Sequence, residues 1–256
     1  MVKIFKESFF RFVHAMSGYF TQLLVSLILL FISRPYNRGA IYTAIWEFFL
    51  ILVFFSAIFN CDHPKKIKII AICLAIPALL FEWLNLFFPT TLFTLFFLIF
   101  MIIFVVVTTT SIVQKVVINA RVRMETLRGV VCAYFMLAFG FAFTFFFLEL
   151  IHPESFHFSY LDPSITKQHL FLSEMLYFSF VTLLCIGYGD IIAVKDVAQT
   201  VVILEGIIGQ FYIAILVSRL VAVYSFFEHK LHLASSKRRK SFADRERKKP
   251  GIQSSE

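Results

Sequence analysis

The stretch Tyr177–Asp190 holds the residues whose types and spacing point to chemistry. Its first part is apolar with helical spacing, and its last six residues are Cys185, Ile186, Gly187, Tyr188, Gly189 and Asp190. Glycine reaches positive φ without steric cost, so alternating glycine with other residues can turn successive backbone carbonyls to the same side. Four such segments around an axis would stack rings of oxygen atoms that replace the hydration shell of a monovalent cation. The stretch therefore predicts a cation-coordinating loop.

Apolar runs of membrane-spanning length flank this loop, at about 129–151 and 197–226. An apolar run, a short helix, a Gly-Tyr-Gly-Asp loop and a second apolar run together resemble the pore module of the potassium channel family. Its known filter sequence is Thr-Val-Gly-Tyr-Gly. The resemblance covers residues 127–227. It implies an outer helix, a re-entrant pore helix, a filter and an inner helix, four copies of which would conduct K⁺ passively.

The resemblance also implies roles for single residues. The backbone carbonyls of Cys185, Ile186, Gly187 and Tyr188 would coordinate K⁺, and Gly189 and Asp190 would complete the filter. Support for the filter is expected from Thr182, Tyr177, Phe178 and Glu205, with Tyr177 placed to donate to Asp190 and Glu205 placed near Ser179 or Thr182.

The inner helix carries the residues expected to control the cavity below the filter. Gly209 stands where resembling pores place a hinge glycine, and Gly206 is expected to pack closely against the pore helix. The side chains expected to face the cavity are Gln210, Ile213 and Val217.

Two positions depart from the family pattern. The family usually has threonine where this chain has Cys185, and a thiol is a soft, weak ligand for a hard cation. We therefore expect a weakened innermost ion site with selectivity largely retained. Val181 stands where some pores carry a glutamate behind the filter, so Asp190 lacks that carboxyl partner.

The composition fits a chain whose solvent is lipid. The 256 residues are 59% hydrophobic and 16% charged, with a mean hydropathy of +0.83. Six apolar stretches qualify as membrane-spanning by their length and composition. They lie at about Tyr19–Ser33, Ala40–Phe59, Ile67–Phe88, Leu92–Gln114, Gly129–Ile151 and Val197–Phe226. The predicted fold is an all-α membrane protein with six transmembrane helices plus the re-entrant pore helix and filter loop.

These stretches predict four segments along the chain. They are a cytosolic N-terminal segment at 1–18, a four-helix transmembrane domain at 19–126, the pore domain at 127–227 and a basic cytosolic tail at 228–256. The first apolar stretch follows a basic lead, so a cleaved signal peptide is the alternative to a retained helix. The first four stretches carry no ladder of arginines, which predicts weak voltage dependence.

The distribution of basic residues predicts the orientation. With the N-terminus inside, the cytosolic segments hold 19 Lys and Arg residues and the outer segments hold four, which places both termini in the cytosol. We expect a multi-pass protein of the cell (plasma or inner) membrane, with the filter loop entering from outside. The basic tail is expected to sit on anionic lipids rather than on nucleic acid.

Three other functions were weighed against a potassium-selective channel. A weakly selective monovalent cation channel is the alternative that Cys185 raises. A potassium uptake transporter would carry four linked pore repeats, whereas this chain has one, and a non-conducting scaffold stays possible. Enzyme motifs are missing from the sequence. We expect a homotetramer without an organic cofactor or small-molecule substrate.

Overall fold

The computed structural model describes residues 19–33, 40–60, 65–118, 124–159, 168–216 and 218. The chain divides into two compact units, Met1–Phe211 and Tyr212–Glu256. The predicted domain boundary at 126/127 falls inside the first unit, so the division of this unit into domains stays a prediction. In the second unit the structure describes a short helical segment, in which the Ser218 hydroxyl donates to the carbonyl of Ala214 over 2.8 Å.

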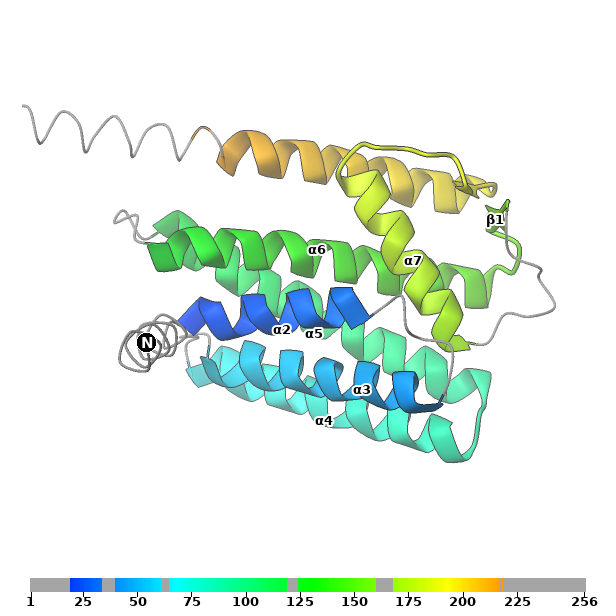
Figure 1. Ribbon diagram of the computed structural model, residues 1–256, viewed down its shortest axis with the longest axis horizontal. Coiled ribbons are helices and arrows are strands. Elements are labelled where there is room, and N and C mark those ends of the chain that lie inside the picture. Colours follow the sequence, from blue (N-terminus) through cyan, green and yellow to red (C-terminus); the bar gives the residue numbers. More distant parts are fainter. Residues whose placement is uncertain are drawn as a thin grey trace, which may run out of the picture. The chain divides into compact units, whose positions relative to one another are not determined.

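The described part of the chain is mainly helical (Figure 1). Its helices are α2 (Tyr19–Ser33), α3 (Ala40–Phe55), the π-helical turn η2 (Ser56–Asn60), α4 (Lys65–Phe87), α5 (Thr91–Ile118), α6 (Met124–Ile151) and α7 (Gln168–Leu183). Two short strands, β1 (Phe156–Phe158) and β2 (Ile191–Ala193), pair antiparallel. A last helix, here called the inner helix, runs over Asp196–Leu216.

Four helices in the described part of the chain are long and apolar enough to cross a membrane. The qualifying segments are Lys65–Asn85, Thr91–Lys115, Leu127–Ile151 and Asp196–Leu216. Helix α2 has 15 residues and α3 has 16. At ~1.5 Å per residue both fall short of a hydrocarbon core of ~30 Å. The total of six spanning helices therefore stays a prediction.

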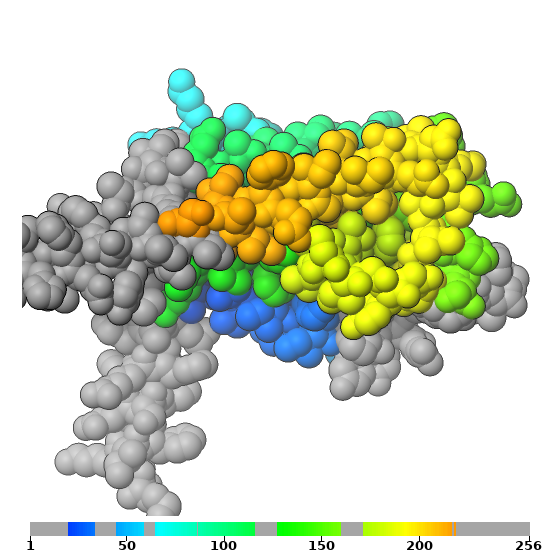
Figure 2. All heavy atoms as spheres, turned by 90° about the horizontal axis from the view of Figure 1, so that it is seen from above, coloured from blue at the N-terminus to red at the C-terminus, as the bar shows by residue number. Residues whose placement is uncertain are grey.

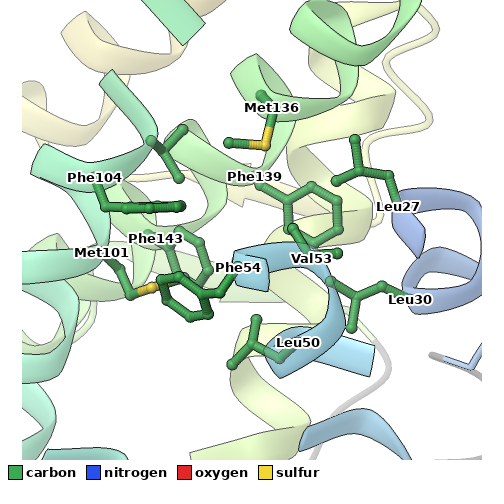
Figure 3. Close-up of a pocket in the computed structure, with 11 residues that line it drawn as sticks. Leu27, Leu30, Leu50, Val53, Phe54, Met101, Phe104, Met136, Phe139 and Phe143 are labelled. Atoms are coloured by element: carbon green, nitrogen blue, oxygen red, sulfur yellow. The ribbon is translucent and has the colours of Figure 1, made fainter. Parts of the chain in front are cut away.

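Helices α2, α3, α5 and α6 form a tight apolar core. Helix α6 is flanked by α2 and α5, α4 packs on α5, and α3 packs on α2 (Figure 1). Figure 3 shows the centre of this core, where leucine, methionine and phenylalanine side chains from the four helices point toward one another. They leave a cavity of only about 10 Å³. The helices are thus held by close side-chain contact, the main source of helix association in lipid.

Helix α2 is docked along α6 and reaches the pore helix. At one end the Arg128 guanidinium donates to the Thr21 hydroxyl over 2.6 Å. The ring of Phe20 lies so close to Gly129 that a Cβ there would meet it at 3.1 Å. At the other end the ring of Phe31 lies 4.9 Å from the ring of Phe180 in α7. The retention of this first helix stays a prediction.

The segment between α6 and α7 is tied both to α6 and to the end of the loop 185–190. The Glu149 carboxylate, near the end of α6, accepts backbone N–H bonds from Glu154, Ser155 and Phe156 at 2.8, 2.9 and 3.1 Å. The following strand β1 pairs with β2, which comes directly after Asp190. Nothing in the sequence indicated this pairing.

Candidate ion-coordinating loop

Helix α7 ends in a capping motif, and the residue that closes this motif is also the first residue of the loop. The Ile186 N–H donates to the Val181 carbonyl and the Cys185 N–H to the Thr182 carbonyl, both at 2.9 Å. This pair of bonds is the Schellman arrangement, in which the residue after the helix end adopts a left-handed conformation and is usually glycine. Here that residue is Cys185, with a φ of 55°.

The backbone of the loop alternates between left-handed and ordinary residues. Cys185, Gly187 and Gly189 have φ values of 55°, 62° and 77°. The intervening Ile186 and Tyr188 are not among the described residues with positive φ. Glycine at 187 and 189 meets this requirement without a steric penalty, whereas Cys185 adopts a conformation that costs a non-glycine residue about 1–2 kcal/mol. The alternation expected from the sequence is therefore present.

The outer end of the loop is held at Asp190 from two sides. The Tyr177 hydroxyl donates to Asp190 Oδ2 over 2.6 Å, which is the approach expected from the sequence. Ser159 donates to the Asp190 carbonyl with both its N–H, at 2.9 Å, and its hydroxyl, at 3.1 Å. The sequence carried no signal for Ser159, because it lies 31 residues away in a polar loop. Asp190 thus has partners despite the missing carboxyl at Val181.

Phe178, the aromatic neighbour of Tyr177, packs against α6 and β1. The ring of Phe178 is buried 5.3 Å from Phe145 in α6 and 5.6 Å from Phe156 in β1. It therefore packs toward the outer helix and the strand, and any support it gives the filter is indirect. Thr182 takes part through its backbone carbonyl, which caps Cys185.

The inner end of the loop is contacted by two side chains. The Gln210 amide donates to the Cys185 sulfur over 2.8 Å. The Tyr134 hydroxyl, from α6, donates to the carbonyl of Leu183 over 3.1 Å. Sequence reasoning placed Gln210 toward the cavity but did not foresee the bond to the thiol, and it missed Tyr134.

Of the two glycines in the inner helix, Gly209 makes the close contact with the pore helix that was expected of Gly206. A Cβ at Gly209 would lie 2.9 Å from both the carbonyl oxygen and Cδ1 of Leu183. A Cβ at Gly206 would meet nothing within 4 Å. The expectation that Gly206 packs against the pore helix is therefore wrong, and Gly209 is the point of close approach. The helix continues through both positions, and a hinge at Gly209 stays a prediction.

Glu205 lies where the sequence suggested, against the pore helix. Its side chain is buried and hydrogen-bonds to the Ser179 hydroxyl through Oε1. Of the other predicted cavity residues, Ile213 is half-buried in the second compact unit. Val217 lies outside the described residues.

The loop and the inner helix leave a large apolar surface uncovered in the single chain. Figure 2 shows this face, with the loop and the helix in yellow. Tyr188 is 68% exposed and Ile186 is 46% exposed. The exposed apolar residues on the inner helix up to Phe211 are Val197, Ile203, Leu204, Ile207, Ile208 and Phe211. Lipid can cover the helix, but a loop with free backbone polar groups needs protein or a water-filled cavity beside it.

The comparisons with known proteins identify the region that contains this loop. A search of curated proteins and a search of solved structures each found no match to the chain. Residues 134–225 match a family model described as an ion channel, over just over a third of the chain. The match begins within α6 and includes α7, the loop and the inner helix. Together with the membrane-length helices, it indicates a membrane protein with an ion-channel pore module.

Proposed function

We propose that four copies of this chain form a potassium-selective channel that conducts K⁺ down its electrochemical gradient. The single observation that carries the proposal is the alternating backbone at Cys185, Gly187 and Gly189. Alternation of this kind directs successive carbonyls to one side, and rings of carbonyls are the ligands that K⁺ channels use in place of water. The ion-channel family match over residues 134–225 supports the class of function.

The tetramer follows from stoichiometry and from the exposed surface. One loop supplies one side of each oxygen ring, so closed symmetry is needed to complete the rings. The side chains of Ile186 and Tyr188 are exposed among the residues that the structure describes, and a neighbouring copy would cover them. We propose a homotetramer in which these side chains brace the loops while the carbonyls of 185–188 hold the ion.

The innermost ion site is the part of the proposal that Cys185 affects. Its sulfur already accepts a bond from Gln210, and sulfur is a poor ligand for K⁺. The remaining carbonyl rings are sufficient for selectivity in our proposal. The alternative, a weakly selective monovalent cation channel, would follow if the inner site dominates selection.

The surroundings of the channel complete the proposal. We propose that it lies in the cell membrane with both termini in the cytosol, so that the loop faces outward. The basic tail would rest on anionic lipids. Helices α2–α5 would surround the pore without sensing voltage, because no arginine ladder is present among them in the sequence.

Purified protein in liposomes tests the proposal. An outward K⁺ gradient is expected to drive uptake of a tracer cation, an equal Na⁺ gradient is expected to drive little, and Ba²⁺ is expected to block the flux. Gly187→Ala, at a φ of 62°, is expected to abolish the difference between the ions, while Gly206→Ala, in open space, keeps it. Equal K⁺ and Na⁺ fluxes would favour the weakly selective alternative, and a monomeric, non-conducting protein would refute the channel.

A further inference from the structure

A carboxyl group lies buried between the helices of the pore module, and the residues that the structure describes give it no charged partner. Glu205, in the inner helix, has 0% of its surface exposed. Its Oε1 meets the hydroxyl of Ser179 in α7 at very short range. Its Oε2 is buried and has no hydrogen-bond partner among the residues that the structure describes.

The hydrogen bonds around Ser179 contain too few protons for an ionised Glu205. The Ser179 oxygen lies within hydrogen-bond distance of Glu205 Oε1 and, at 2.8 Å, of the Ala138 carbonyl in α6. A serine hydroxyl has one hydrogen to donate. With a carboxylate, one of the two contacts would bring together two oxygens with no hydrogen between them. With a carboxylic acid, Glu205 donates to Ser179 and Ser179 donates to Ala138.

The electrical surroundings favour the same assignment. A carboxylate taken out of water without a cation or several N–H donors costs several kcal/mol. Among the residues that the structure describes, Tyr134 on α6 lies close enough to interact electrostatically with Glu205, and a tyrosine cannot supply a positive charge. On α7, Glu174 lies five residues before Ser179, so it is on another side of that helix.

We propose that Glu205 is held as a neutral carboxylic acid and acts as a positioning residue, donating the proton that joins the inner helix to the pore helix. The neutral state of Glu205 does not depend on the proposed channel function, whereas its effect on ion selectivity rests on that function. The chain of bonds Glu205–Ser179–Ala138 links the inner helix, the pore helix and the outer helix.

The hydrogen bond from Glu205 to Ser179 acts close to the residue at which the filter begins. Gly209, one turn after Glu205, approaches the carbonyl of Leu183, which also accepts the Tyr134 hydroxyl. Leu183 lies two residues before Cys185. Losing the Glu205 bond would therefore loosen the inner helix beside the backbone that positions the innermost ion site.

Infrared spectroscopy of the full-length protein in lipid tests the protonation directly. The difference spectrum between wild type and Glu205→Gln at neutral pH is expected to contain the carbonyl band of a carboxylic acid that shifts in D₂O. Ser179→Ala is expected to move this band to higher frequency, because its hydrogen-bond partner is gone. A carboxylate band in the difference spectrum, or a band unmoved by Ser179→Ala, would overturn the proposal.

Ion flux tests the consequence through a conservative and a disruptive variant. The amide of Glu205→Gln can donate to Ser179 as the acid does, so its K⁺-to-Na⁺ flux ratio is expected to match the wild type. Glu205→Ala is expected to lower the ratio by about tenfold, in line with the loss of one buried hydrogen bond. Equal impairment of the two variants would overturn the positioning role. If the wild type itself fails to conduct while the acid band is present, the channel function fails and the neutral carboxyl stands.

Discussion

At the residue scale, Cys185 has to satisfy two structural demands at once. It caps the pore helix in a left-handed conformation, and it begins the loop that would coordinate K⁺. Glycine would suit the cap best, whereas a hydroxyl-bearing side chain would suit a K⁺ site better. Cysteine has an unbranched Cβ, which tolerates positive φ better than a β-branched residue does. Its thiol is then held by Gln210.

Substitutions at Cys185 separate the two demands. Cys185→Ser adds a hydroxyl on an unbranched Cβ, so we expect higher K⁺ occupancy of the innermost site and a higher K⁺-over-Na⁺ permeability ratio. Cys185→Thr adds the same hydroxyl but places a β-branched residue at a φ of 55°, so its tetramer is expected to be less stable by about 1 kcal/mol or more. Bi-ionic reversal potentials and thermal dissociation of the tetramer measure the two effects. Identical permeability ratios and identical stabilities in all three proteins would contradict this account.

The bond between Tyr177 and Asp190 has a similarly direct test. Tyr177→Phe removes a 2.6 Å hydrogen bond to a carboxylate, a loss of about 2 kcal/mol at the outer end of the loop. We expect shorter single-channel openings, because among the described residues this end of the loop then keeps its bonds to Ser159 and to the Ile191 N–H. Asp190→Asn keeps an acceptor without its charge and should give an intermediate result. Open times equal to the wild type in Tyr177→Phe would show that the bond does not support the filter.

At the element scale, the inner helix needs glycine at position 209 but not at position 206. Gly209→Ala would place a Cβ 2.9 Å from the Leu183 backbone oxygen, so we expect a displaced pore helix, lower tetramer stability and reduced K⁺ flux. Gly206→Ala meets no neighbour and improves helix propensity by about 1 kcal/mol, so it should be as stable as the wild type or more so. Thermal dissociation and liposome flux of the pair are the measurements.

The same pair of variants distinguishes close packing from bending. If Gly209 serves only as a hinge, Gly209→Ala should change the open probability and leave the stability of the tetramer unchanged. That outcome would contradict the close-contact account and support the hinge predicted from the sequence.

The four helices before the pore predict a weak response to voltage. Helix α4 carries lysines only in its first turn, Lys65, Lys66 and Lys68, and α5 carries one in its last turn, Lys115, whereas α2 and α3 contain none. These charges lie at helix ends and form no ladder along a span. Moving one charge across the membrane contributes about 2.3 kcal/mol per 100 mV, and steep gating needs several such charges. The open probability is therefore expected to vary little between negative and positive potentials in single-channel recordings. A steep sigmoidal dependence would show that charges outside these helices sense the field.

The sequence predicted the helices better than the contacts between them. The apolar run Tyr19–Ser33 coincides with α2, and the run expected at 129–151 lies within α6, because apolar periodicity is a local signal. The pairing of β1 with β2 and the carboxylate cap at Glu149 join residues without such a signal. The packing of Gly206 was predicted wrongly because both glycines fit the same spacing, and only the tertiary contact with Leu183 tells them apart.

At the scale of the whole molecule, the proposed channel needs more than one chain. Its loop exposes Tyr188 and Ile186 together with backbone groups that cannot face lipid, whereas Phe178 and Met175 behind them are buried. One side of the loop is thus packed against the chain's own buried side chains, and the side that carries Ile186 and Tyr188 is exposed. Symmetric assembly around that exposed side would cover the exposed side chains and bring the carbonyls of four loops to a common axis.

The most direct test of this account is the reversal potential of the purified protein in a planar bilayer with K⁺ on one side and an equal concentration of Na⁺ on the other. If the carbonyls of Cys185, Ile186, Gly187 and Tyr188 from four chains replace the hydration water of K⁺, the current reverses far from zero in the direction set by K⁺. Gly187→Ala should bring the reversal close to zero. A wild-type reversal near zero, or an absence of current from a protein that is folded in the bilayer, would contradict the account.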